Sequence, residues 1–202
     1  MKIIKEEYRE EYGKRVREIK NIFLNAYSDY YNLVYIEPYL KKYKSKSDIV
    51  DEKMLLQPAR HFMESIVRTL QEEFILIICS LEDGYDNSNS LKRLSERLKN
   101  CYLINSDLYS KEMQEMPERD KNIKNARDKA IAHFDFNCNA DKVFMTEVKN
   151  RLDILKNCFN SYLFGDMVKY KIDDNSIEKI ATESRIGVEQ LFYGFVNWIC
   201  NR

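Results

Sequence analysis

The sequence predicts an all-α protein, and three observations support this fold class. Five of the 202 residues are glycine and three are proline, while Lys, Glu, Leu and Ile are abundant. This composition favours helices over a sheet-rich sandwich or barrel. Apolar residues also recur every three or four positions through several long segments, which is helical periodicity. With 44% hydrophobic residues the chain can bury a sizeable core, so we expect a single domain over residues 1–202, with one domain and an appended helix as the alternative.

The first predicted helix lies near the N-terminus and ends or kinks at Pro38. Its apolar positions are Tyr8, Tyr12, Val16, Ile19, Phe23, Ala26, Tyr30 and Leu33. Its tyrosines, with Tyr31 and Tyr35, suit the core and its rim, although tyrosine rings can also stack on nucleic-acid bases. For the basic connector that follows we expect a solvated loop, with phosphate contact as the alternative; its lysines are Lys41, Lys42, Lys44 and Lys46.

The second predicted helix begins after Pro58, because the first turn of a helix tolerates proline. Its apolar positions predict a central core helix and are Phe62, Ile66, Leu70, Phe74 and Ile77. The polar, glycine-containing segment 83–89 then breaks the chain. Asn89 or Ser90 is placed to cap a third helix, whose apolar face is marked by Leu91, Leu94 and Leu98.

The second half of the chain alternates weak and strong helical patterns. Residues 105–121 lack a clear period and predict a loop that flanks a helix at 125–135. The next helix ends at Gly165, and its apolar positions are Val143, Val148, Leu152, Leu155, Phe159 and Leu163. Capping oxygens at 173–176 predict a last helix with apolar positions Ile177, Ile180, Ile186, Leu191, Phe195 and Ile199. Four residues are expected to be buried: Leu70, Phe74, Leu152 and Leu155.

The charges and the cysteines exclude several classes of protein. Thirty-three basic and thirty-three acidic residues balance, so nucleic-acid contact needs a local patch rather than a global field. The N-terminus lacks the apolar stretch of a signal peptide, and the longest apolar run, at 74–79, is too short to span a membrane. Five cysteines without a Cys-x-x-Cys pair disfavour a disulfide framework and a zinc site. We therefore expect a cytoplasmic protein with buried, reduced thiols.

One stretch of the chain indicates chemistry: residues 125–135, which read Asn-Ala-Arg-Asp-Lys-Ala-Ile-Ala-His-Phe-Asp. It contains Arg127, Asp128 and Lys129 in succession, and then His133, one of two histidines in the chain. Its alanines favour helix, and their small side chains let another backbone approach closely. The stretch therefore predicts a crowded polar site around Arg127 and His133.

This run resembles the signature of the HEPN superfamily (higher eukaryotes and prokaryotes nucleotide-binding), an Arg followed after four to six residues by a His. It is most similar to the abortive-infection U-type members, and the specific match covers about residues 119–136. The resemblance implies an antiparallel HEPN-like helical bundle with additional helices, a homodimer, and metal-independent RNA cleavage in a toxin or phage-defence system. His61 has no Arg at the required upstream spacing, so we interpret it as a structural or surface histidine.

Other kinds of catalytic site find no support in the sequence. It has no glycine-rich phosphate loop, Gly-x-Ser-x-Gly elbow or dinucleotide fingerprint, and neither histidine has Glu three residues before it, as a carboxylate-bridged metal bundle needs. We therefore expect no cofactor and no metal. The imidazole of His133 can take the 2′-hydroxyl proton of RNA or protonate the leaving oxygen. The guanidinium of Arg127 can hold the charge that develops on the phosphorane.

The spacing of these two residues predicts a site shared by two chains. Six residues along a regular helix correspond to about 600° of rotation and ~9 Å of rise, so Arg127 and His133 lie on different faces. Two copies that cross at this stretch could bring both pairs onto one phosphate, as the resemblance also implies. Basic residues cluster near the motif and suit contact with one or two phosphates: Arg119, Lys121, Lys124, Arg127 and Lys129. Of these we expect Lys121, Lys124 and Lys129 to contribute to RNA binding, with a solvated and internally paired helix face as the alternative.

The carboxylates beside the motif leave two interpretations open. Asp128 is expected to orient Arg127 or His133 and is counted with them as a catalytic candidate, although Asp128 and Asp135 could instead cap or solubilise the helix. Asp135 stands where one HEPN subgroup has a Tyr that a partner nucleotidyltransferase antitoxin modifies, which puts that route of neutralisation in doubt. An antitoxin or defence protein is a candidate partner. The alternative function is a catalytically silent helical module that binds protein or nucleotide.

Overall fold

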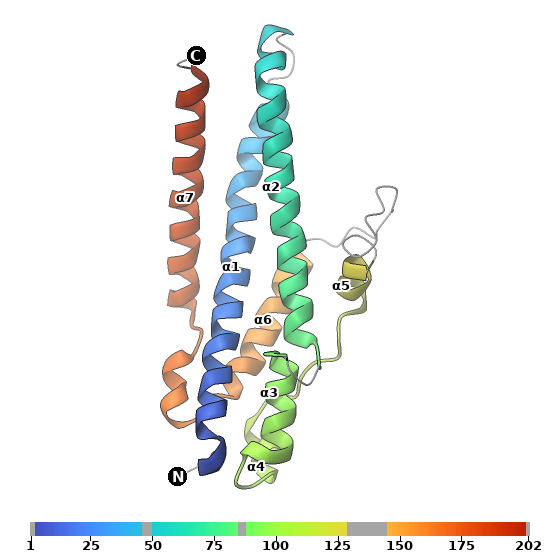
Figure 1. Cartoon of the computed structure of the whole chain (residues 1–202), viewed down its shortest axis with the longest axis vertical. Coiled ribbons are helices and arrows are strands. Elements are labelled where there is room, and N and C mark those ends of the chain that lie inside the picture. The colour runs from blue at the N-terminus through green and yellow to red at the C-terminus, as the bar shows by residue number, and fades with distance from the viewer. Residues whose placement is uncertain (1–2, 46–49, 85–87, 129–144, 201–202) are drawn as a thin grey trace. The chain divides into compact units, whose positions relative to one another are not determined.

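The computed structural model describes residues 3–45, 50–84, 88–128 and 145–200. In these ranges the chain forms helices and no strand (Figure 1). An isolated antiparallel bridge joins Ile4 to Leu103. The all-α fold class is therefore confirmed. Across the same ranges, each helix is too short or too polar to cross a membrane.

Along the described residues, two long helices are followed by three short ones and then by two longer ones. In order they are α1 (Arg9–Ser45), α2 (Val50–Glu82), α3 (Leu91–Arg97), α4 (Asp107–Glu112), α5 (Lys121–Ala126), α6 (Met145–Ser161) and α7 (Asp174–Cys200). The described residues also form the 3-10 helices η1 (Glu6–Tyr8) and η4 (Gly165–Tyr170) and the π-helix η2 (Leu98–Tyr102). Ser90 caps α3, as predicted, because its hydroxyl accepts a hydrogen bond from the Arg93 N–H at 3.1 Å. Gly165, with φ of 53°, adopts the left-handed conformation that glycine favours.

The ends of α1 and α2 differ from the prediction. Pro38 lies inside α1, which continues to Ser45, so the basic connector is helical at least as far as that residue. The helix α2 begins at Val50, eight residues before Pro58. Residues 50–57 include Glu, Lys, Met, Leu and Gln, which are good helix formers, so the helix extends on the N-terminal side of Pro58. Residues 105–121 likewise contain the short helix α4, followed by irregular chain to Asp120.

The chain divides into two compact units, to both of which α1 and α2 contribute. Unit 1 comprises Met1–Ala26 and Ile75–Asp173, and unit 2 comprises Tyr27–Phe74 and Asp174–Arg202. That the whole chain behaves as one domain stays a prediction.

The core of unit 1 forms between α1 and α6, which run antiparallel. The ring centroids of Phe23 and Phe159 are 5.4 Å apart. Tyr12 lies on the same face of α1, nearer its N-terminus, and contacts the residues that follow α6. The Tyr12 hydroxyl donates to the Tyr162 carbonyl at 2.7 Å and accepts from the Phe164 N–H at 3.0 Å. The fully buried residues of this face include Val16, Ile19, Val148, Leu152 and Leu155. The predicted burial of Leu152 and Leu155 is confirmed.

The core of unit 2 is formed by the second half of α1, the first half of α2 and α7. Its buried members are Ile36, Val188 and Phe192, and those packed around them are Tyr35, Tyr39, Ile66, Val67 and Leu70. The rings of Tyr39 and Phe192 stack at 4.1 Å. Phe74 is fully buried, as predicted, whereas Leu70 is partly buried. The tyrosines of α1 whose side chains the structure describes are buried or partly buried, as expected for the core and its rim.

The apolar face of α7 is narrower than predicted. Ile177, Val188 and Phe192 are buried, but Ile186 is 43% exposed and Leu191 is 48% exposed. A helix packed on one side buries one stripe, and Ile186 lies about 180° from Ile177 around a regular helix. The apolar positions predicted for this helix therefore include residues from both its buried face and its exposed face.

Candidate functional site

The helix α5 places Arg127 at the edge of unit 1. Asp120 begins the helix, because its carboxylate accepts hydrogen bonds from the backbone N–H of Asn122 at 2.9 Å and of Ile123 at 3.1 Å. Ile123 and Ala126 are buried and fix the orientation of the helix. Arg127 follows directly, still with helical dihedral angles, and 24% of its side chain is exposed.

Part of the predicted site lies outside the described residues. His133, Lys129 and Asp135 all fall within 129–144. Arg127 and Asp128 are described, as are Lys121 and Lys124, both exposed on α5. The structure therefore locates the guanidinium half of the predicted Arg127–His133 pair.

Arg127 is held by two carboxylates. Asp128 Oδ1 accepts a hydrogen bond from Arg127 Nε at 2.8 Å and lies 2.6 Å from Nη2. On the other side, Arg127 Nη1 lies 4.0 Å from Oδ2 of Asp83, a residue directly after α2. The hydrogen bond from Arg127 lowers the pKa of Asp128, and the positive charges of Lys124 and Arg119 act in the same direction. This pair is thus charged throughout the neutral range.

These residues belong to a larger group of paired charges, which we name the charged cluster: Glu82, Asp83, Arg119, Arg127, Asp128 and Arg151. Arg119 Nη2 donates to Asp83 Oδ1 at 2.7 Å, and its Nε lies 3.9 Å from Glu82 Oε2. The cluster joins the end of α2 to α5 and α6, so the position of Arg127 depends on three helices (Figure 1).

The buried side of the charged cluster is the pair of Glu82 and Arg151. Arg151 donates to Glu82 and also to the backbone carbonyl of Glu118, and 3% of the Glu82 side chain is exposed. Burial raises the pKa of Glu82, against the opposing effect of Arg151. Cys79 lies on the same side, and burial raises the pKa of its thiol although Arg127 and Arg119 oppose the shift.

The comparison with known families covers the part of the chain that contains this site. The family model HEPN_AbiU2, described as AbiU2, matches residues 5–165, which include the charged cluster and the motif. The chain belongs to the AbiU2 family of HEPN proteins. No curated protein and no solved structure gives a match to it. The family predicted from the Arg127–His133 run is thus confirmed, and the match ends before α7 begins.

Three members of the charged cluster in this HEPN protein were not predicted from the sequence: Glu82, Asp83 and Arg151. Arg151 gave a usable signal, because it falls three residues after Val148 and four before Leu155, on the apolar face of α6. A charged residue on a buried face needs a charged partner. Which acidic residue is that partner depends on how α2 and α6 pack, and no sequence pattern indicates it.

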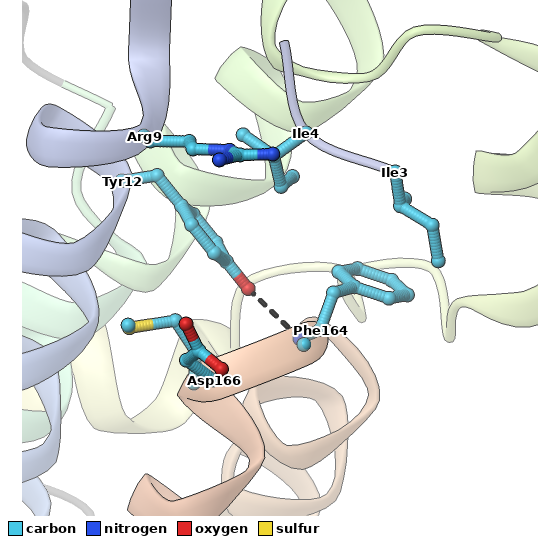
Figure 2. Close-up of a pocket in the computed structure, with 8 residues that line it drawn as sticks. Ile3, Ile4, Arg9, Tyr12, Phe164 and Asp166 are labelled. Carbon is cyan, nitrogen blue, oxygen red and sulfur yellow. Dashed lines mark hydrogen bonds between the residues drawn. The ribbon is translucent and has the colours of Figure 1, made fainter. Parts of the chain in front are cut away.

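Unit 1 of this HEPN protein also has a cavity of about 350 Å³ beside Tyr12. It is lined by Ile3, Ile4, Arg9, Tyr12, Phe164, Gly165, Asp166 and Met167. Figure 2 shows Tyr12 pointing toward Phe164, with Arg9 and Asp166 on separate walls. The guanidinium of Arg9 is exposed and pairs with Glu6 at 3.0 Å. The lining shares no residue with the charged cluster, and we assign it no part in the site.

Proposed function

We propose that this HEPN protein is a metal-independent endoribonuclease with an abortive-infection or toxin role. Membership of the AbiU2 family supports an abortive-infection HEPN module, and the proposal adds RNA cleavage to it. One observation carries the proposal: Arg127 of the HEPN motif is held half-buried at a cluster of paired charges, six positions before His133. A fixed, partly exposed guanidinium suits the binding of a phosphate.

In the proposed reaction the 2′-hydroxyl of RNA attacks the adjacent phosphorus, and the bond to the 5′-oxygen breaks. His133 takes the hydroxyl proton or protonates the leaving oxygen, and a second histidine or water completes the proton balance. Arg127 holds the negative charge on the phosphorane, and Asp128 orients Arg127. The products are a 2′,3′-cyclic phosphate and a 5′-hydroxyl. Three lysines would contact flanking phosphates: Lys121, Lys124 and Lys129.

The proposed enzyme acts as a homodimer in the cytoplasm. On a regular helix, Arg127 and His133 are about 600° of rotation apart, so two chains that cross at the motif would assemble the site better than one. An antitoxin or another defence protein would hold the activity in check. Abortive infection needs such control, because RNA cleavage harms the cell that carries the enzyme.

Cleavage of single-stranded RNA in the presence of a metal chelator tests this proposal. His133→Ala should abolish cleavage, and Arg127→Ala should lower the rate by about 10²–10³, which is typical of losing a transition-state donor. His61→Ala is the control and should leave the rate unchanged, because 75% of the His61 side chain is exposed on α2. Cleavage that survives both motif substitutions would rule out the Arg127–His133 assignment.

The second candidate function is a catalytically silent HEPN module that binds protein or nucleotide. The contacts of Arg127 favour it, because Asp128 and Asp83 already pair with the guanidinium. The balance of basic and acidic residues in the chain favours it too. For such a module, Arg127→Ala would lower the melting temperature, and there would be no RNA cleavage to lose.

A further inference from the structure

Arg119 and Arg127 both contact the carboxylate of Asp83, each through a different oxygen. The Nη2 of Arg119 donates to Asp83 Oδ1 at 2.7 Å, while Arg127 Nη1 lies 4.0 Å from Asp83 Oδ2. Arg119 is 32% exposed and Arg127 is 24% exposed, measured on the side chains. We propose that Arg119 is a second phosphate-binding residue of the ribonuclease site, and that Asp83 positions its guanidinium beside that of Arg127. This inference rests on the proposed function.

Asp83 is needed because two guanidiniums at this separation repel each other. A carboxylate between them offsets the repulsion and fixes their spacing. Each guanidinium carries five N–H donors in a rigid fork, so contact with one oxygen of Asp83 uses a small part of its donor capacity. A phosphate has several acceptor oxygens, and two guanidiniums on one side can each donate to one of them.

The three arginines of the charged cluster differ in a way that singles out Arg119. Arg151 has 10% of its side chain exposed and donates to Glu82 and to the Glu118 carbonyl, which are contacts of a structural residue. Arg119 has its Nε 3.9 Å from the buried Glu82 carboxylate and its Nη2 on the half-buried Asp83. It is therefore anchored at its buried end, as Arg127 is anchored by Ala126 and α5.

A measurement of RNA binding without cleavage tests whether Arg119 contacts phosphate, independently of any role in catalysis. The probe is a fluorescent RNA oligonucleotide with 2′-O-methyl groups, which cannot be cleaved by 2′-hydroxyl attack, and its anisotropy is measured over a range of salt concentrations. Arg119→Ala should weaken binding about tenfold and reduce the slope of log affinity against log salt by about 0.7, as one lost phosphate contact on a single strand predicts. Arg93→Ala is the matched control, because Arg93 is 19% exposed and pairs with Glu96 at 3.0 Å on α3. It should leave the slope unchanged.

Steady-state cleavage tests the positioning role of Asp83. Asp83→Asn keeps the shape and removes the charge, so kcat should fall about tenfold while the melting temperature stays close to wild type. Asp83→Glu should restore part of that loss. Arg119→Ala should raise KM more than it lowers kcat, because a phosphate contact is present in both the ground state and the transition state.

The outcomes separate this inference from the proposed function. If the wild-type protein cuts RNA and Arg119→Ala behaves like Arg93→Ala, the role of Arg119 is overturned and the nuclease stands. If Asp83→Asn cuts RNA as fast as wild type, the positioning role is overturned. A wild-type protein that binds the probe through Arg119 but cuts no RNA supports the phosphate contact and contradicts the nuclease. A protein that neither binds nor cuts RNA contradicts both.

Discussion

Glu82 and Asp83 are neighbours in the sequence, yet their surroundings differ. Glu82 is buried against Arg151, and Asp83 contacts Arg119 and Arg127 at the half-exposed edge of the same group. Burying a charge costs several kcal/mol unless a partner compensates for it, so we expect the Glu82–Arg151 pair to be needed for a stable fold. Asp83 is more exposed, so replacing it should lower the stability of the protein less than replacing Glu82.

Substitution of Glu82 should therefore destabilise the protein strongly. Glu82→Gln leaves the Arg151 guanidinium buried without its counter-charge, and we expect a loss of about 3 kcal/mol in the free energy of unfolding. Asp153→Asn, which breaks the more exposed pair with Lys149 on α6, should cost at most about 1 kcal/mol. Chemical denaturation of the two variants gives the comparison. Equal losses would show that the buried pair is no stronger than a surface pair.

Asp29 in unit 2 should make stability depend on pH. Burial is the main cause that raises its pKa to about 7 from the ordinary value of 3.8, and the negative charge of Glu73 acts in the same direction. The folded state then binds more protons than the unfolded state between about pH 4 and 7, so this group lowers stability as pH rises through that window. Asp29→Asn should be more stable than wild type by on the order of 2 kcal/mol at pH 8, with little difference at pH 4. A difference that stays constant from pH 4 to 8 would contradict the shifted pKa.

At the scale of elements, helix type was predictable and helix ends were not. The periodic positions of α1 and α6 indicated the buried residues correctly, because packing of one apolar stripe decides which face is inside. The boundaries expected at Pro38 and Pro58 are wrong, because both residues lie within longer helices. The kink expected at Pro38 as the alternative stays a prediction. A single proline costs about 3 kcal/mol in a helix, and packing of the flanking turns can offset that cost.

Replacing a glycine by alanine should change the stability of the protein in opposite directions at Gly187 in α7 and at Gly165 in η4. Gly187 lies in the middle of α7, with no atom near the place that a Cβ would occupy, so Gly187→Ala should stabilise the protein by about 0.5–1 kcal/mol. Gly165 has a φ of 53°, which strains any residue with a Cβ, so Gly165→Ala should destabilise it by about 1 kcal/mol. Melting temperatures of the two variants check both signs. A loss of stability in Gly187→Ala would contradict the open surroundings of this position.

For the whole molecule, the sequence was enough to predict the family but not the surroundings of the motif. The run from Arg127 to His133 is local, and its match to a known signature needed no knowledge of the fold. The charged cluster joins residues 36 or more positions apart, Asp83 to Arg119 and Glu82 to Arg151, and it exists only because three helices meet. Contacts of that kind follow from packing, which a single sequence does not specify.

Self-association through the motif should be visible in light scattering at micromolar concentration. We expect a mass of two chains for the wild type, since a composite site needs two copies of Arg127 and His133. Ala130→Glu should give a folded monomer that no longer cleaves RNA, because a long charged side chain would prevent close approach of two copies of the motif. Ile154→Glu, at a position of α6 that is 46% exposed, is the control and should remain dimeric. A monomeric wild type would remove the shared site.

The chemistry of the cut ends tests the central claim most directly. RNA is incubated with the purified protein in excess chelator, and the 3′ ends of the products are identified by mass spectrometry. The Arg127–His133 mechanism predicts a 2′,3′-cyclic phosphate or its hydrolysis product on one fragment and a 5′-hydroxyl on the other, with neither formed by His133→Ala. Products with a free 3′-hydroxyl and a 5′-phosphate, or cleavage that needs a divalent ion, would contradict it, because 2′-hydroxyl attack cannot produce those ends and the proposed site uses no metal.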